Sequence, residues 1–387
     1  MKRPAKRYGR LAALVLLWGV GGCGALSSPS AQTDSPAQAS ESAQDKRVVL
    51  ENATLEHAGK RGQTRWKLQV ERVRYSHDRQ RAQLEGLRGN LYRQGELVLQ
   101  VEAQQGKLAR ERQTLTFQGE IAATDPRNAV TIRSDRLAWQ AQQGILVAPN
   151  RLSARTPQAA VSAQQGRYKA SQQQLTLTGG IEAQTQDPAV RLQTQRLRWS
   201  LAQQELTTDH RVRLERERAG AQPDGLVAGG ATVALPATRV QLQERVTLQS
   251  VADSLQLATE RALWRPQART VTFERPVRAV DHDAGVTLEA ARGQLQLEAE
   301  TIRLRGGVRA RREDGQAKLY ARQLSWDISQ QHLRAQGEVA YRQQDPPLAT
   351  AGSTATGRLA QKQISVQGQS GEQRAVTQIA PQSPSSQ

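Results

Sequence analysis

Residues that could perform catalysis are scattered through this sequence and form no recognisable set. The densest polar cluster, Asp281-His282-Asp283, is typical of a turn. Gly368-Gln369-Ser370-Gly371 is not a nucleophile elbow, because its second glycine comes one residue early. The histidines show none of the i, i+2 or i, i+4 pairs common in metal sites: His57, His77, His210, His282 and His332. The sequence therefore predicts a non-catalytic protein with no cofactor or metal.

Cys23 is the single cysteine of the sequence, and the residues before it predict a signal peptide. The first ten residues carry five basic side chains and no acid, and an apolar run follows from Leu11 to Val20. Gly21 and Gly22 then leave room for a peptidase. The apolar run is shorter than the roughly 20 residues that span a bilayer. We therefore predict a signal peptide over 1–22, with Cys23 as the first mature residue.

Val20-Gly21-Gly22-Cys23 resembles the bacterial lipobox, which implies a lipidated Cys23 and a membrane anchor. The alternative is an ordinary secretory signal with an incidental cysteine. Bacterial lipoproteins typically carry several acyl chains, which hold a protein stably where one chain does not. Residues 23–46 are rich in Ser, Ala, Gln and Pro, and predict a flexible, lipidated tether.

The chain is strongly basic, with 54 Lys and Arg against 36 Asp and Glu and a formal charge of +18. Arginine offers forked donors that suit phosphate and carboxylate groups. An exported protein rarely meets nucleic acid, so we expect no nucleic-acid partner. Phosphorylated glycolipids and membrane head groups are the expected acidic partners. The charge is equally compatible with a solvated basic face that only keeps the protein soluble.

Apolar and polar residues alternate through most of the chain, which is typical of antiparallel strands with one buried and one wet face. Val130 and Ile132 alternate with Thr131 and Arg133, for example. The pattern divides the chain into a first block, a Gly-, Ala- and Pro-rich linker or long loop, a second block and a polar, disordered tail: 47–217, 218–238, 239–370 and 371–387.

The strand pattern also repeats with a period of about 30 residues. Arg136-Leu137-Ala138-Trp139 recurs as Arg196-Leu197-Arg198-Trp199, and again as Gln323-Leu324-Ser325-Trp326. Asp125-Pro126, Asp187-Pro188 and Asp345-Pro346 recur as turn punctuation. The mature tryptophans all occupy the aromatic place of the repeat or one like it: Trp66, Trp139, Trp199, Trp264 and Trp326.

The recurring Leu-x-Trp or x-Tyr, Gln-rich turn, Leu-x-Leu and Gly-x-Ile resembles the OstA-like repeats of lipopolysaccharide-transport proteins. The lipobox, the tether and Asn52-Ala53-Thr54-Leu55-Glu56 leading to Trp66-Lys67-Leu68 look most like the LptC family. The resemblance implies an all-β fold, an open, twisted antiparallel β-jellyroll, here in two consecutive blocks. The best-known members are about half this length and carry a transmembrane helix instead of a lipobox.

The resemblance also implies a function. The protein would sit in the periplasm, accept lipid A acyl chains in a groove, and pass lipopolysaccharide from the inner-membrane ABC transporter towards the outer membrane. Its partners would be the transporter permease subunits and an LptA-like periplasmic bridge protein. The inner membrane is the implied site of the anchor, but Gly24 does not match the usual retention signal, which leaves the outer membrane open.

Apolar positions of the repeats are the candidate lining of the groove. They face the same side of the sheet, so each is equally compatible with plain core packing. The candidates are Trp66, Leu68, Val70, Ile132, Leu137, Trp139, Leu175, Leu177, Leu197, Trp199, Trp264, Leu324 and Trp326. A different class of function is a structural or assembly lipoprotein whose repeats bind other envelope proteins without carrying lipid.

Overall fold

The computed structural model describes residues 48–59, 62–109, 114–218, 221–235, 239–249, 255–358, 363–368 and 376–378. The predicted signal peptide (1–22), Cys23 and the predicted tether (23–46) lie outside them. Among the described residues, no helix has the length and apolar content that crossing a membrane requires.

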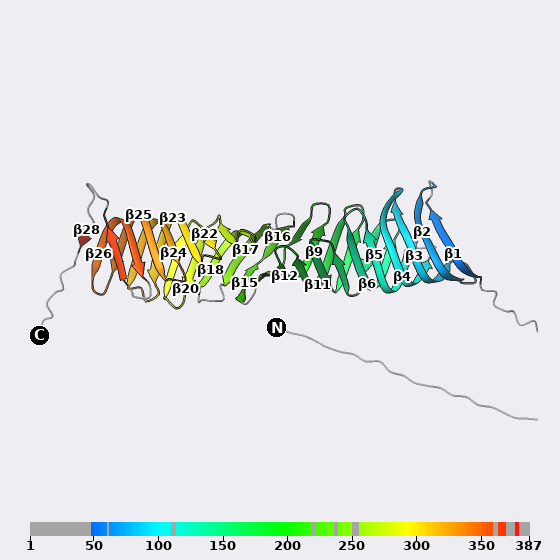
Figure 1. Cartoon of the computed structure of the whole chain (residues 1–387), viewed down its shortest axis with the longest axis horizontal. Helices are drawn as coiled ribbons and strands as arrows, with labels where there is room; N and C mark the ends of the chain where they lie inside the picture. The colour runs from blue at the N-terminus through cyan, green and yellow to red at the C-terminus, as the bar shows by residue number, and fades with distance from the viewer. Residues whose placement is uncertain are drawn as a thin grey trace, which may run out of the picture. The chain divides into compact units, whose positions relative to one another are not determined.

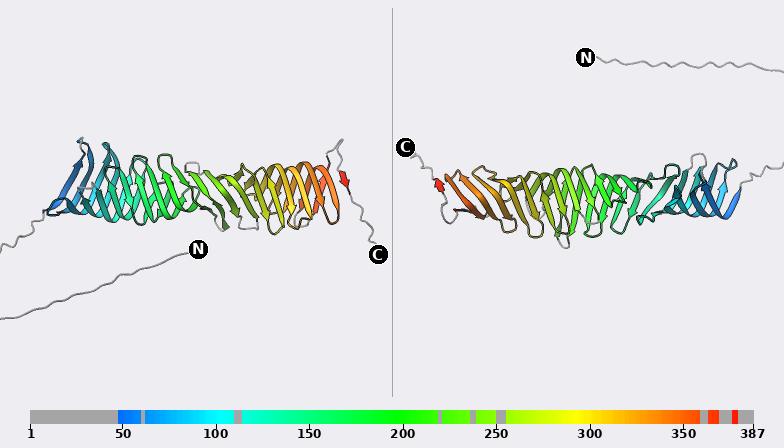
Figure 2. Two further views of the ribbon diagram at one scale, coloured as in Figure 1. Left: turned by 180° about the vertical axis from the view of Figure 1, so that it is seen from behind. Right: turned by 90° about the horizontal axis from the view of Figure 1, so that it is seen from above.

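The described residues form antiparallel strands, as the alternating pattern predicts, and the strands follow one another in chain order (Figures 1 and 2). The strands are β1 (Val49–Ala58), β2 (Thr64–Tyr75), β3 (Arg81–Arg93), β4 (Glu96–Ala109), β5 (Thr114–Asp125), β6 (Val130–Gln140), β7 (Ile145–Ala148), β8 (Leu152–Arg155), β9 (Ala159–Ala163), β10 (Gln165–Lys169), β11 (Gln174–Thr185), β12 (Val190–Ser200), β13 (Glu205–Thr208), β14 (Val212–Arg218), β15 (Ala221–Ala228), β16 (Gly230–Ala234), β17 (Arg239–Gln249), β18 (Leu255–Arg265), β19 (Thr270–Phe273), β20 (Val277–Asp281), β21 (Val286–Ala290), β22 (Arg292–Gln296), β23 (Thr301–Arg312), β24 (Ala317–Asp327), β25 (His332–Gln343), β26 (Leu348–Arg358), β27 (Gln363–Gln367) and β28 (Val376–Gln378).

The sheet consists of two halves. Each long strand passes from one half into the other, whereas each short strand lies within a single half. The long strand β6, for example, pairs with β8 through its first residues and with β7 through its last. We call the half that contains β8, β9, β14, β15, β20 and β21 half-sheet 1. The half that contains β7, β10, β13, β16, β19 and β22 is half-sheet 2. Both the predicted all-β class and the antiparallel jellyroll are confirmed, and the sheet remains open because β1 and the last strands keep free edges.

A β-bulge bends most long strands where they pass from one half-sheet to the other. In β5 the register shifts between Gln118 and Ile121, and in β11 it shifts between Thr178 and Ile181. Gly119 and Gly179 occupy these bends with φ values of +74° and +80°. A side chain is disfavoured at both positions because of the positive φ. A Cβ would also lie 2.5 Å from a glutamine Oε1, that of Gln104 on β4 at Gly119 and that of Gln164 between β9 and β10 at Gly179.

One inward row of half-sheet 2 contains the repeated aromatic residues. Pairing from strand to strand joins Trp139 to Leu146 and Leu146 to Tyr168, and the row continues through Leu175 to Trp199. The same row reaches Trp264 and Trp326 further along. We call it the aromatic row. Smaller side chains dominate the facing rows of half-sheet 1, such as Ala123, Ala154, Ala183 and Ala279, so the two halves together fill the interior at close packing.

The predicted linker at 218–238 is wrong, because β15 and β16 lie within it. β15 pairs with β14 and β17, and β16 pairs with β13 and β17. Leu226, Ala228, Ala231 and Val233 are buried and carry the strand alternation. Because many residues of this segment are small, its strand pattern was not recognised. One strand lies in each half-sheet, and both connect the first predicted block to the second.

The predicted disordered tail, 371–387, is corrected at one point. Within it the structure describes β28, which pairs with β26 through Ala349, Thr350 and Ala351. The last described strands therefore extend the sheet beyond the predicted second block, which ends at 370.

Candidate functional site

The interior along most of the sheet is filled by the protein's own side chains. All thirteen predicted groove residues are at most 5% exposed and belong to one continuous hydrophobic cluster. Trp139, Trp264 and Trp326 are fully buried. The structure therefore brings the predicted residues together, but as a packed core.

Trp66 stands apart from the other tryptophans. It pairs with His57 on β1 and Leu91 on β3, at the end of β2 that belongs to half-sheet 1. The His57 and Trp66 rings stack, with centroids 5.5 Å apart. Four of the five tryptophans therefore lie in the aromatic row, and Trp66 occupies a different place, in half-sheet 1.

The aromatic row ends in a gap near the C-terminal end of the sheet. Trp326 pairs with Leu333, Leu333 with Gly357, and Gly357 with Ile364. Position 357 lies 31 residues after Trp326, the spacing that separates Leu295 from Trp264, and the chain has a glycine there. A large side chain is therefore missing from the row at this point.

A cavity of about 330 Å³ occupies this region, between the two half-sheets. Leu333, Gly357 and Ile364 line it from half-sheet 2. Residues of half-sheet 1 line the facing wall, among them Ala310, Leu319 and Tyr341. We call this cavity the C-terminal slot. None of the thirteen predicted groove residues lines it.

The walls of the C-terminal slot are apolar, whereas its rim is polar and mostly basic. Arg312 lines it from half-sheet 1 and Arg358 from half-sheet 2. The guanidinium of Arg312 lies 2.5 Å from the carboxylate of Asp314. The Tyr341 hydroxyl donates to Gln343 Oε1 at 2.7 Å, and burial raises the pKa of Tyr341 against the opposing influence of Arg312. An amphiphile with an apolar chain and an anionic head would match this arrangement.

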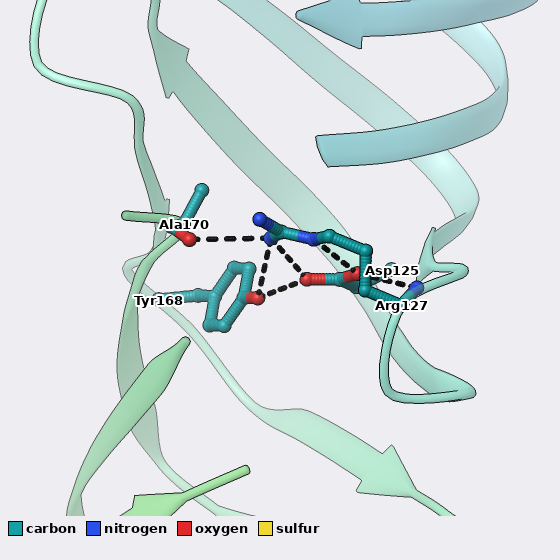
Figure 3. Close-up of polar contacts among 4 residues, drawn as sticks. All are labelled: Asp125, Arg127, Tyr168 and Ala170. Carbon is teal, nitrogen blue, oxygen red and sulfur yellow. Dashed lines mark hydrogen bonds and ion pairs between the residues drawn. The ribbon is translucent and has the colours of Figure 1, made fainter. Parts of the chain in front are cut away.

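The outer ends of the half-sheets carry two rows of turns that face each other, and we call the line between them the seam. Asp125, at the end of β5 in half-sheet 1, accepts a hydrogen bond from the hydroxyl of Tyr168 on β10 in half-sheet 2 (Figure 3). Arg127 Nη2 binds Asp125 Oδ2 at 2.6 Å and donates to the carbonyl of Ala170 at 3.2 Å. The seam is therefore fastened by a polar cluster at this point.

The Asp281-His282-Asp283 cluster forms a turn, as its sequence suggests. Asp281 Oδ1 accepts hydrogen bonds from the backbone N–H groups of Asp283 and Ala284, each at 2.9 Å. Within the described residues, no three His, Cys, Asp or Glu side chains are grouped so that they could hold a metal ion.

Sequence reasoning missed the residues that shape the slot and the seam. The missing side chain at Gly357 could have been found by extending the repeat spacing one step beyond Trp326. Asp125 was predicted only as part of a turn, and no neighbouring residue in the sequence indicates its contact with Tyr168, 43 residues away.

Fold and site together define a non-globular class of protein: a bent antiparallel sheet with free edges and an apolar slot suited to an amphiphile. The family model of LptC-related lipopolysaccharide-assembly proteins matches residues 11–151 and 145–251. The chain therefore belongs to the LptC-related family, as the sequence resemblance indicated. A search of curated proteins found no match.

Family membership gives the general function. LptC-related proteins take part in lipopolysaccharide transport, with lipopolysaccharide and the transport complex as partners, in an envelope-associated, periplasmic location. The family is one of transport and assembly proteins and not of enzymes.

Proposed function

We propose that this protein accepts lipid A acyl chains of lipopolysaccharide in the C-terminal slot and passes them along a periplasmic protein bridge towards the outer membrane. The single observation that carries the proposal is the slot itself, an apolar cavity at the point where the aromatic row lacks a side chain. Each CH₂ that enters such a space contributes about 0.8 kcal/mol. An acyl chain can thus bind there without displacing the packed core.

Arg312 and Arg358 are the proposed partners of the lipid phosphates. They stand on opposite walls at the rim of the slot, where a head group can remain in water while the chain lies inside. Guanidinium groups bind phosphate through paired, charge-assisted hydrogen bonds. The thirteen interior residues predicted as groove lining would act mainly as the packed wall behind this site.

The free sheet edges are the proposed docking sites for neighbouring transport proteins. Among the described residues, β1 pairs with β2 alone, and Val48, Val49 and Leu50 beside its start are 37%, 48% and 39% exposed. An unpaired edge can accept a strand from another sheet. We propose that the permease subunits of the ABC transporter and an LptA-like protein dock at these edges. Lipidated Cys23 would hold the protein at the membrane.

The test is photo-crosslinking of the purified mature protein with a diazirine-labelled C16 fatty acid, followed by mapping of the labelled peptides. We expect labelling around Leu333 and Ile364, which line the slot. Gly357→Trp would fill the gap and abolish this labelling. A Cβ at position 357 would lie 3.3 Å from the carbonyl oxygen of Gln363, so the backbone there must yield by a few tenths of an ångström to admit the indole.

Gly225→Trp is the matched control, because a Cβ there meets nothing within 4 Å and the residue lies on β15, away from the slot. It adds the same indole and should leave labelling unchanged. The proposal fails if the wild type is not labelled at the slot, or if both tryptophan variants are labelled equally. Confirmation with lipopolysaccharide would use a photoreactive residue at Ile364, where capture of protein alone would favour an assembly role without lipid.

A further inference from the structure

Two buried carboxylates occupy matching places on the seam. Asp125 ends β5 and Asp281 ends β20, both in half-sheet 1, with exposed fractions of 0% and 1%. Within the part of the chain that the structure describes, these two aspartates are the buried carboxylates. Each binds the backbone of its own turn through Oδ1 and reaches across the seam through Oδ2.

The two crossings differ in their partners. Asp281 Oδ2 accepts a hydrogen bond from Gln331 Nε2 at 3.4 Å. Asp125 accepts a hydrogen bond from the Tyr168 hydroxyl, and Arg127, which binds both Asp125 oxygens from the same turn at 3.0 and 2.6 Å, donates across the seam to the carbonyl of Ala170 at 3.2 Å. Charged partners make hydrogen bonds roughly twice as strong as neutral ones. The contact between Asp125, Arg127 and Tyr168 is therefore a charge-assisted fastening across the seam.

An amphiphile inside the sheet is constrained by its head group. The acyl chain gains from the apolar interior, but burying a charged head there costs far more than the chain gains. The head must stay in water while the chain lies between the half-sheets, so a lipid that travels along the sheet has to move with its head in the seam. A side-chain cluster that bridges the seam blocks that movement.

We propose that Asp125, Arg127 and Tyr168 form a latch that closes the seam and bars acyl chains from the interior beyond it. This inference rests on the proposed function and adds a regulated step to it. The C-terminal slot is open without any release, whereas the interior on the far side of the latch, around Leu137 and Trp139 on β6, becomes accessible only when the latch parts. A cavity of about 320 Å³ lies over Trp199 in the seam, lined by Arg127 on one side and Gln204 on the other. A parted latch would open into it.

The test compares wild-type mature protein with two release variants, Tyr168→Phe and Asp125→Asn, which remove a donor or a charge and keep the side-chain shape. Tyr320→Phe is the matched control, because Tyr320 is 39% exposed and lies on the outer face of β24, opposite to the slot-lining Leu319. Backbone hydrogen exchange reports on latch opening. We expect exchange in β10 to rise roughly tenfold in each release variant, from the loss of one charge-assisted hydrogen bond, and to stay unchanged in β24.

The diazirine-labelled C16 fatty acid then reports on access. In wild type and Tyr320→Phe, labelled peptides should come from the slot alone. In the release variants, labelling should extend to the peptides that contain Leu137 and Trp139. The latch is refuted if wild type is already labelled there, if exchange in β10 does not change, or if labelling stays at the slot although exchange has risen. In each of these cases, labelling at the slot leaves the proposed function intact. No labelling at the slot in any variant would reject the proposed function, and this inference with it.

Discussion

Trp326 separates the filled interior from the C-terminal slot, so truncating it should lengthen the slot inwards. Trp326 is fully buried and pairs with Leu333, which in turn lines the slot beside Gly357. Trp326→Ala removes an indole from a packed row, a change that costs about 3–5 kcal/mol of stability. We expect the space that it vacates to join the slot, because Trp326 pairs directly with the slot-lining Leu333 and adjacent strands lie only about 4.8 Å apart.

The measurable consequence is a change in preferred chain length. Each additional CH₂ that is buried contributes about 0.8 kcal/mol, which is close to a fourfold gain in affinity. In wild type the gain should stop where the end of the chain meets Trp326. In Trp326→Ala it should continue for at least two further carbons, an increase of about 16-fold for the longer chain. The assay is competition by saturated C8 to C18 fatty acids against a fluorescent fatty acid.

Trp264→Ala provides the control for this experiment. Trp264 is fully buried in the same aromatic row and should cost similar stability, but it lies two repeats away from Trp326. The chain-length limit should therefore remain that of the wild type. An unchanged limit in Trp326→Ala, or an equal shift in both variants, would refute the interpretation of the slot as the end of the aromatic row.

Two further predictions concern the seam and the anchor. Burial and the bond to Asp125 raise the pKa of Tyr168 above its ordinary value of 10.0. Its stabilising contribution is therefore complete below pH 10 and is lost at higher pH, because the unfolded chain releases the proton first. Urea unfolding at pH 9 and pH 11 should show a larger loss of stability for wild type than for Tyr168→Phe; equal losses would contradict the assignment. Cys23→Ser should move the protein from the membrane fraction to the soluble fraction, and a protein that stays in the membrane would argue against lipidation of Cys23.

Much of the fold could be predicted from local pattern. Val130, Ile132, Leu137 and Trp139 alternate with polar residues in the sequence and are buried in β6. Side chains on successive strand residues point to opposite faces, so period two is legible without knowing the partner strands. The period-two pattern did not reveal the strands in segment 218–238, because the inward residues there include alanines, which are only weakly hydrophobic. The glycines of the segment also resemble those of a loop.

The candidate site was harder to predict, because its central feature is the absence of a side chain. A search for groove residues selects large apolar positions, and those positions turned out to fill the interior. Gly357 becomes informative only when the register from Trp326 through Leu333 is known. Arg312 and Arg358 are two among many arginines until the two half-sheets are seen to bring them to one rim.

A packed aromatic row is compatible with lipid carriage if the role of its tryptophans is to fill the space between the half-sheets with their large side chains. Within the described residues, the indole N–H groups of Trp139, Trp264 and Trp326 are buried and have no hydrogen-bond partner. A buried donor without an acceptor costs about 1–3 kcal/mol, so these positions are not occupied by tryptophan for the sake of its polar group. Their size closes the space between the half-sheets, and the glycine at 357 reopens it at one end. Under the proposed function, an acyl chain would enter where the row ends and be excluded where the row continues, so the passage of lipid would depend on how the seam opens.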